Sequence, residues 1–148
     1  MKERVRAILV TPSGTLLTIK RMRPGVEPYW VLPGGGVEPT DASLEAGLAR
    51  EIREELDGEA VVHALVKVNE DGDQREYFYL ARIAHWDPDR RTGPEFADPA
   101  QGEYIVEEIP LTAEGIGRIA LKPTSIAGLI ADRAAELFHL ADLRTQRI

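Results

Sequence analysis

The chain contains no cysteine among its 148 residues, and it carries only three histidines, at positions 63, 85 and 139. The lack of cysteine excludes disulfides and thiolate chemistry, and the three histidines are too scattered to form a metal-binding motif. No apolar run approaches the length that spans a membrane, and the start MKERVRAILV lacks the long apolar stretch of a signal peptide. We therefore expect a cytoplasmic protein that uses neither thiols nor a membrane.

The sequence also has fewer positively charged than negatively charged side chains. The sequence has 18 lysines and arginines against 25 acidic residues, which gives a net charge of −7. This balance argues against a nucleic acid partner, because the phosphates would be repelled. A small anionic substrate stays compatible, because bound cations invert the local field. With 43% hydrophobic residues, the composition predicts one globular domain over residues 1–148.

The most informative segment covers residues 32–55 and reads LPGGGVEPTDASLEAGLAREIREE. A glycine turn, where the backbone can approach a ligand closely, precedes a helix that is rich in carboxylates. Glu51, Glu54 and Glu55 are spaced i, i+3 and i+4, so they share one face of that helix. Like charges at this spacing cost about 0.2–0.5 kcal/mol per pair. A hard divalent cation with oxygen ligands, Mg²⁺ or alternatively Mn²⁺, would balance them.

The same helix also has a purely structural interpretation. Arg50 can pair with Glu54 at i+4, and a helix laced with charges is usually a solvated face. The adjacent glycine turn favours a ligand site instead. Four apolar residues repeat every fourth position and predict a buried stripe beside the carboxylates: Leu44, Leu48, Ile52 and Leu56. The acids should therefore lie at the edge of the core and face a cleft.

This segment resembles the signature of the Nudix hydrolase family: Gly, five residues, Glu, seven residues, Arg-Glu, an aliphatic residue, any residue, Glu-Glu, any residue, Gly. Gly35 fits the first position, and Arg50–Glu55 matches the helical core without a gap. Asp41 replaces the first Glu, eight residues separate it from Arg50, and Asp57 stands at the final glycine position. The resemblance implies an α/β fold, the Nudix-type α/β/α sandwich with a mixed sheet between helices.

The resemblance also implies roles for single residues. It makes four groups candidate metal ligands, the carbonyl of Gly34 and the side chains of Glu51, Glu54 and Glu55. The candidate catalytic residues are Glu54, Glu55 and Arg50, with Glu54 as a ligand or the base. Asp41 either pairs with Arg50 or only caps the helix.

Family members also use an acid on a distal loop. Aligning Gly102-Glu103-Tyr104 with a similar stretch in the family points to Asp98 as a further metal ligand, with Glu95 and Glu103 as alternatives. Each of these acids also has a plain interpretation as a solvated loop residue.

The candidate substrate-binding residues are two arginines that precede the glycine turn and two glycines within it: Arg21, Arg23, Gly35 and Gly36. The two arginines either clasp a phosphate or are surface charges. Three aromatic residues either stack on a nucleobase or pack in the core: Tyr29, Trp30 and Tyr104.

Apolar alternation and turn residues predict strands at residues 5–10, 16–20, 29–32, 60–68, 76–84 and 104–107. Loops are predicted at residues 21–28 and 87–101. The first helix should be N-capped by Thr40 or Asp41, and the second should run from Pro123 to about Leu143. We expect the extra signature residue to be absorbed around residues 40–43, which leaves the helix regular from Leu44.

The implied activity is a Mg²⁺-dependent pyrophosphohydrolase that cleaves the diphosphate linkage of a small nucleotide. We expect a nucleoside diphosphate derivative of the ADP-ribose type as substrate, because the polar loop at residues 87–101 can cover a second polar group. A nucleoside triphosphate pyrophosphohydrolase of the MutT type and a catalytically silent nucleotide sensor are the alternatives. The uninterrupted REIREE argues against the sensor. Both a monomer and a homodimer fit the sequence.

Overall fold

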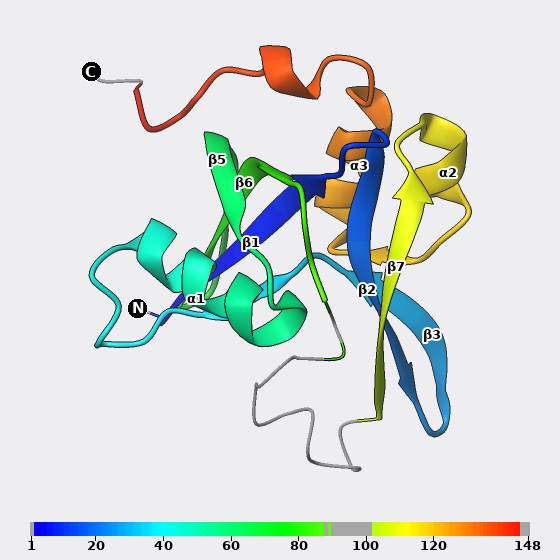
Figure 1. Ribbon diagram of the computed structural model, residues 1–148, viewed down its shortest axis with the longest axis horizontal. Helices are drawn as coiled ribbons and strands as arrows, with labels where there is room; N and C mark the ends of the chain where they lie inside the picture. Colours follow the sequence, from blue (N-terminus) through cyan, green and yellow to red (C-terminus); the bar gives the residue numbers. More distant parts are fainter. Residues whose placement is uncertain (1, 88, 90–101, 146–148) are drawn as a thin grey trace.

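Residues 2–87, 89 and 102–145 are described by a computed structural model (Figure 1). The strands are β1 (Lys2–Val10), β2 (Thr15–Arg23), β3 (Val26–Val31), β4 (Gly34–Gly36), β5 (Ala60–Asp71), β6 (Gln74–Ile83), β7 (Glu103–Pro110) and β8 (Leu121–Lys122). The helices are α1 (Leu44–Leu56), α2 (Ala113–Gly117), α3 (Thr124–Asp132) and the 3₁₀ turn η4 (Leu137–His139). All the described strands join one mixed sheet of eight, in which β1–β6 and β3–β8 are parallel.

Side chains of the central strands alternate between two apolar cores on opposite faces of the sheet. On one face, β1 and β6 pack against α1 through Val5, Ala7, Leu9, Tyr79, Ala81, Leu48, Ile52 and Leu56. On the other face, the same strands pack against α2 and α3 through Ile8, Val10, Phe78, Leu80, Ile116, Ile126 and Ile130. Helices therefore cover both faces of a mixed sheet, and the predicted α/β sandwich is confirmed.

The sheet divides where β1 and β2 separate. β1 pairs with β2 only near their shared turn, from Leu9↔Leu17 to Val10↔Leu16. Farther along, β4 takes the edge of β1, while β2 continues between β3 and β7. The result is two wings, β5-β6-β1-β4 and β7-β2-β3-β8, which spread apart in Figure 1. The cleft described below opens between them.

Two predicted irregular segments are in fact strands. The predicted loop at residues 21–28 is wrong, because β2 extends to Arg23 and β3 already begins at Val26. Gly25 makes this tight turn possible with φ 75°, a conformation that other residues rarely adopt. The predicted glycine turn forms the short strand β4 on β1. Strand pairing thus continues through segments whose glycine and proline residues predicted loops.

The predicted second helix is much shorter than expected. It ends at Asp132 instead of about Leu143, and the chain continues through turns to the 3₁₀ turn at Leu137–His139. The physical reason is the open edge of β5. Leu143 donates its N–H to the Leu65 carbonyl at 2.8 Å, and the Asp142 carboxylate accepts from the Leu65 N–H at 3.1 Å. These bonds satisfy an exposed strand edge, which a straight helix would leave unpaired.

Asp142 should make this C-terminal segment sensitive to acid. The Arg144 guanidinium, bonded to the Asp142 carboxylate at 2.8 and 3.0 Å, holds the pKa of Asp142 well below its usual range. A depressed folded-state pKa contributes stability above the unfolded pKa of about 4, and this stability is lost as pH falls below it. We expect Asp142→Asn to lower the free energy of unfolding at pH 7, by an amount that shrinks below pH ~4. Urea titrations across this range test the idea, and a pH-independent difference would contradict it.

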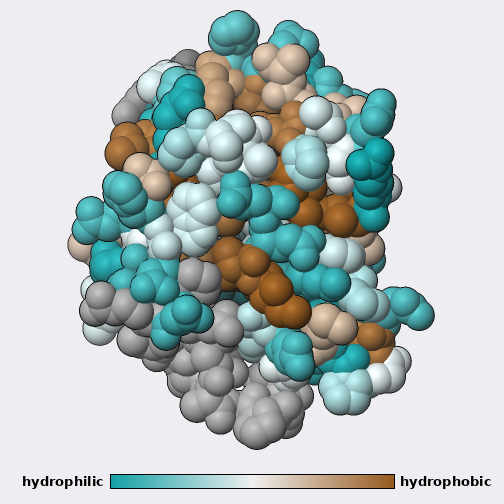
Figure 2. Space-filling model, turned by 45° about the vertical axis from the view of Figure 1, so that its right-hand side comes forward, coloured by the Kyte–Doolittle hydropathy of each residue, from teal (hydrophilic) through white to brown (hydrophobic). Residues whose placement is uncertain are grey.

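The outer surface carries few large apolar side chains. Figure 2 shows one face as a mosaic of hydrophilic side chains with short apolar stretches between them. Among the described residues, the exposed large hydrophobic side chains are Met22, Val26, Val61 and Ile105. Met22 and Ile105 lie near each other on the paired strands β2 and β7, and a few exposed apolar residues of this kind are normal on a globular surface. No helix in the described part of the chain is both long and apolar enough to cross a membrane.

Candidate active site

Helix α1 is held at both ends by its own sequence. Ser43 is the N-cap, because its hydroxyl accepts the Ala46 N–H at 3.0 Å; the prediction of Thr40 or Asp41 is wrong. At the other end Asp57 adopts a left-handed conformation with φ 48°, as helix C-termini often require. The helix runs without interruption from Leu44, so the extra signature residue is absorbed before it, as predicted.

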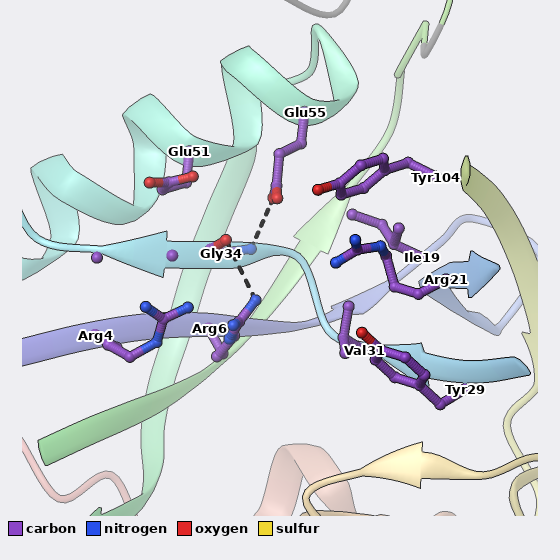
Figure 3. Close-up of a pocket in the computed structure, with 12 residues that line it drawn as sticks. Arg4, Arg6, Ile19, Arg21, Tyr29, Val31, Gly34, Glu51, Glu55 and Tyr104 are labelled. Carbon is purple, nitrogen blue, oxygen red and sulfur yellow. Dashed lines mark hydrogen bonds between the residues drawn. The ribbon is translucent and has the colours of Figure 1, made fainter. Parts of the chain in front are cut away.

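Two carboxylates of α1 face the glycine strand. Glu51 and Glu55 are only 9% and 7% exposed, and acidic side chains are rarely buried to this extent unless they are paired. The Glu55 carboxylate accepts the Gly34 N–H at 2.8 Å. A Cβ at Gly35 would lie 2.6 Å from an oxygen of Glu51, so a larger residue there would displace this carboxylate. Figure 3 shows both carboxylates on one side of the glycine strand.

Arg50 ties the loop before the helix to the acids on it. Its Nε and Nη2 bind the two oxygens of Asp41, each at 3.0 Å, and Nη2 also donates to the Gly36 carbonyl at 3.0 Å. Nη1 contacts Glu51 and Glu54, both at 3.1 Å. The bond to Asp41 is the main cause that raises the pKa of Arg50, and the same bond lowers the pKa of Asp41. The predicted Asp41–Arg50 ion pair is therefore confirmed.

Gly47 makes room for Asp41 against the helix. A Cβ at Gly47 would lie 2.9 Å from Oδ2 of Asp41. That oxygen is already fixed, because it accepts from the Glu38 N–H at 2.8 Å and from Arg50. The shorter acid at position 41 thus reaches Arg50 by lying directly on α1, which a side chain at position 47 would prevent.

We expect Gly47→Ala to lower activity without a matching loss of stability. Alanine in a helix gains up to about 1 kcal/mol over glycine, but here it displaces Asp41 and loosens Arg50. Gly128→Ala in α3 is the matched control, because a Cβ there meets nothing within 4 Å. The control should gain stability and keep full turnover. Urea unfolding and steady-state kinetics on both variants test this, and equal turnover in the two would contradict it.

The opposite wing supplies a row of three side chains. Arg21 of β2 is paired in register with Tyr29 of β3 on one side and with Tyr104 of β7 on the other. Cross-strand partners project from the same face of a sheet, so the three form one wall of the cleft. The Arg21 guanidinium lies 3.8 Å from the centre of the Tyr104 ring, in a cation–π contact. The cleft between the wings has a volume of about 380 Å³.

Two arginines of β1 line the same cleft and were not predicted. Figure 3 shows Arg4 and Arg6 on the side of the glycine strand opposite Glu51 and Glu55. Arg6 bonds to Glu76 at 3.0 Å and to the carbonyls of Leu32 and Gly34 at 3.0 and 3.3 Å. The sequence signal was present, because two arginines at i and i+2 share one face of an otherwise apolar strand.

The other predicted site residues are distributed more widely. Glu54 contacts Arg50 but does not line the cleft, and Arg23 lies apart from it beside Met22 and Pro24. Trp30 donates its indole N–H to Glu107 at 3.1 Å on a different part of the surface. Glu103 is exposed at the start of β7. Asp98 and Glu95 lie outside the described residues.

The oxygen atoms at this site fit a divalent cation. Among the described residues, no three acidic or histidine side chains converge into a ready-made metal cluster. Nevertheless, two buried carboxylates stand against the glycine strand, and hard cations such as Mg²⁺ prefer carboxylate and carbonyl oxygens as ligands. Glu51 and Glu55 are therefore the side chains that would hold it, with Glu54 next to them on α1. The Gly34 carbonyl, predicted as a further ligand, accepts from Arg6 at 3.3 Å.

Comparison with known proteins agrees with this geometry. Residues 1–115 match the profile of the NUDIX domain. The solved structure of the E. coli ORF135 protein is 26% identical with a TM-score of 0.61, and the match covers 96% of this chain and 95% of that one. A NUDIX hydrolase from Nitrosomonas europaea is 15% identical with a TM-score of 0.68, over 99% and 96% of the two chains.

A third structure, an ADP-ribose pyrophosphatase from Streptococcus suis, is 16% identical with a TM-score of 0.63 over 95% and 96% of the chains. No curated protein matches the chain significantly. The profile match covers more than half of the sequence, including the glycine strand, α1 and the row on the opposite wing. The chain is a member of the Nudix hydrolase family.

Proposed function

We propose that the protein hydrolyses the diphosphate linkage of a small nucleotide with the help of Mg²⁺. The observation that carries the proposal is the pair of buried carboxylates, Glu51 and Glu55, against a glycine strand in a cleft lined by arginines. Arginines and aromatic rings suit phosphates and bases, respectively. The carboxylates suit a cation that neutralises the diphosphate.

In the reaction, a water oxygen bonds to one phosphorus of the diphosphate while the bond from that phosphorus to the bridging oxygen breaks. The bridging oxygen leaves with the second phosphate, and the water proton passes to a carboxylate base. Glu54, Glu55 and Asp98 are the proposed candidates for that base. Mg²⁺, when bound, supplies positive charge that offsets the developing negative charge. Arg50 positions the acids, and the Tyr29–Arg21–Tyr104 row orients the nucleotide.

Two classes of substrate are proposed, diphosphate-linked compounds and nucleoside triphosphates. The sequence predicts a diphosphate-linked compound of the ADP-ribose type, but its basis, the loop at residues 87–101, lies almost wholly outside the described residues. The likeness to the S. suis ADP-ribose pyrophosphatase, at 16% identity, shows the fold alone. The second candidate is a nucleoside triphosphate, and the position of Arg4 in the cleft favours it.

A product assay tests the proposed activity directly. The protein is incubated with ADP-ribose or a nucleoside triphosphate in Mg²⁺, and inorganic pyrophosphatase or alkaline phosphatase is then added. Phosphate that alkaline phosphatase releases from the ADP-ribose reaction indicates cleavage to phosphomonoesters, because intact ADP-ribose has no terminal phosphate. Phosphate that pyrophosphatase releases from the triphosphate reaction indicates a triphosphate substrate. Reactions run without Mg²⁺, with Mg²⁺ restored for the coupling enzymes only after the protein is removed, should give neither signal. If no phosphate appears from any nucleotide in a panel, the proposed function is wrong.

A further inference from the structure

Arg4 differs from the other arginines of the cleft in having few partners. Among the described residues, its ion pair is with Glu76 at 3.7 Å, which is too long for a hydrogen bond. Glu76 is already bound by Arg6 at 3.0 Å, so its charge is largely taken. The Arg4 side chain is nevertheless only 27% exposed. A guanidinium has five N–H donors, more than the distant Glu76 carboxylate takes up, so Arg4 keeps donors for a molecule bound in the cleft that it lines.

The surroundings of Arg4 also favour an anionic ligand. Burial, followed by the repulsion of Arg6, lowers the pKa of Arg4 more than the attraction of Glu76, Glu51 and Glu55 raises it. By contrast, Arg21 is stacked on Tyr104, and Arg6 donates to the carbonyls of Leu32 and Gly34. Arg4 therefore has donor capacity left for a bound molecule, whereas Arg6 is largely taken by protein acceptors.

Position along the glycine strand indicates which part of a substrate Arg4 meets. Arg4 is in register with Gly36, whereas Arg6 is in register with Gly34, about 7 Å farther along. Figure 3 shows Arg4 at one end of the drawn residues and the Arg21–Tyr104 pair at the other, with Glu51 and Glu55 between. A nucleotide whose base lies on the Arg21–Tyr104 wall places its diphosphate at the carboxylates. The next group then reaches Arg4.

We propose that Arg4 binds the terminal phosphate of a nucleoside triphosphate and so selects triphosphates over diphosphate sugars. This inference rests on the proposed function, because it takes the carboxylates as the site of diphosphate cleavage. A terminal phosphate offers two or three anionic oxygens to the Arg4 fork, which the neutral sugar of ADP-ribose does not. Arg4 is thus a specificity-determining residue outside the signature segment.

ATP and ADP-ribose form a matched pair for the test, because they differ only in the group beyond the second phosphate. The variants are Arg4→Gln, Arg4→Lys and the control Arg53→Gln, which removes an exposed positive charge from α1. The readouts are kcat/KM for both substrates in Mg²⁺, and calorimetric Kd values for α,β-methylene-ATP and ADP-ribose in EDTA, where neither is hydrolysed. Thermal midpoints of all variants check that the fold is intact.

We expect Arg4→Gln to lower the preference for the triphosphate, in kcat/KM and in 1/Kd, by at least about thirtyfold. Arg4→Lys should recover part of the preference, and Arg53→Gln should leave it unchanged. An equal loss for both ligands, or an unchanged preference, would overturn the assignment of Arg4. Binding without hydrolysis would overturn the proposed function alone, because the Kd ratio still judges Arg4. Binding of neither ligand by the wild-type protein would overturn both.

Discussion

Glu55→Gln is expected to lower kcat by at least about a hundredfold while the protein stays folded. The substitution keeps the shape of the side chain, and the amide oxygen can still accept the Gly34 N–H that Glu55 binds at 2.8 Å. It removes the negative charge that a divalent cation needs. The variant should therefore lose stabilisation of the transition state but keep its fold. Steady-state kinetics over a Mg²⁺ titration should show a lower kcat and a higher metal requirement.

Two comparisons make this result specific. Glu59→Gln removes an exposed acid just beyond α1 and should leave kcat within about twofold. Glu54→Gln tests the prediction that Glu54 is also a ligand or the base, although it does not line the cleft. Thermal midpoints without metal should change little in all three variants. Full activity in both Glu54→Gln and Glu55→Gln would remove these acids from the mechanism.

The helical half of the site was readable from the sequence because its signals are local. The apolar repeat from Leu44 to Leu56 predicted the buried stripe, and the structure buries Leu48, Ile52 and Leu56. The spacing of the acids then placed Glu51 and Glu55 at the edge of the core. Two details were misplaced: Asp41 is used by Arg50 and leaves Ser43 to cap the helix, and Glu54 contacts Arg50 without lining the cleft. Local patterns and tertiary contacts agree along this segment.

The other half of the cleft depends on contacts that a single sequence does not display. Arg4 and Arg6 enter the site because the sheet divides beside β1 and lets β4 take its edge. Tyr29, Arg21 and Tyr104 form a row only through the pairing of three strands, one of them far away in the chain. The second helix was predicted too long for a similar reason, since Asp142 and Leu143 instead form hydrogen bonds with the edge of β5.

Both the pairing of β4 with β1 and the geometry of the site depend on glycine at position 34. Its φ is 146°, a region that L-residues rarely enter, and a Cβ there would overlap the Val5 carbonyl oxygen and lie 2.8 Å from Arg6 Cα. Both obstacles are backbone atoms of β1, so no side chain can move aside to relieve them. An added methyl group would have to push β4 away from β1.

We therefore expect Gly34→Ala to lower the free energy of unfolding by about 3 kcal/mol or more. Gly36→Ala on the same strand is the matched control, because a Cβ there meets nothing within 4 Å, and its cost should stay below about 1 kcal/mol. Urea denaturation of both variants gives the comparison. Similar stabilities for the two variants would mean that β4 is not held against β1 in solution. Because the displaced strand also carries the Gly34 N–H bonded to Glu55, activity in any folded Gly34→Ala protein should fall with the pairing of the strand.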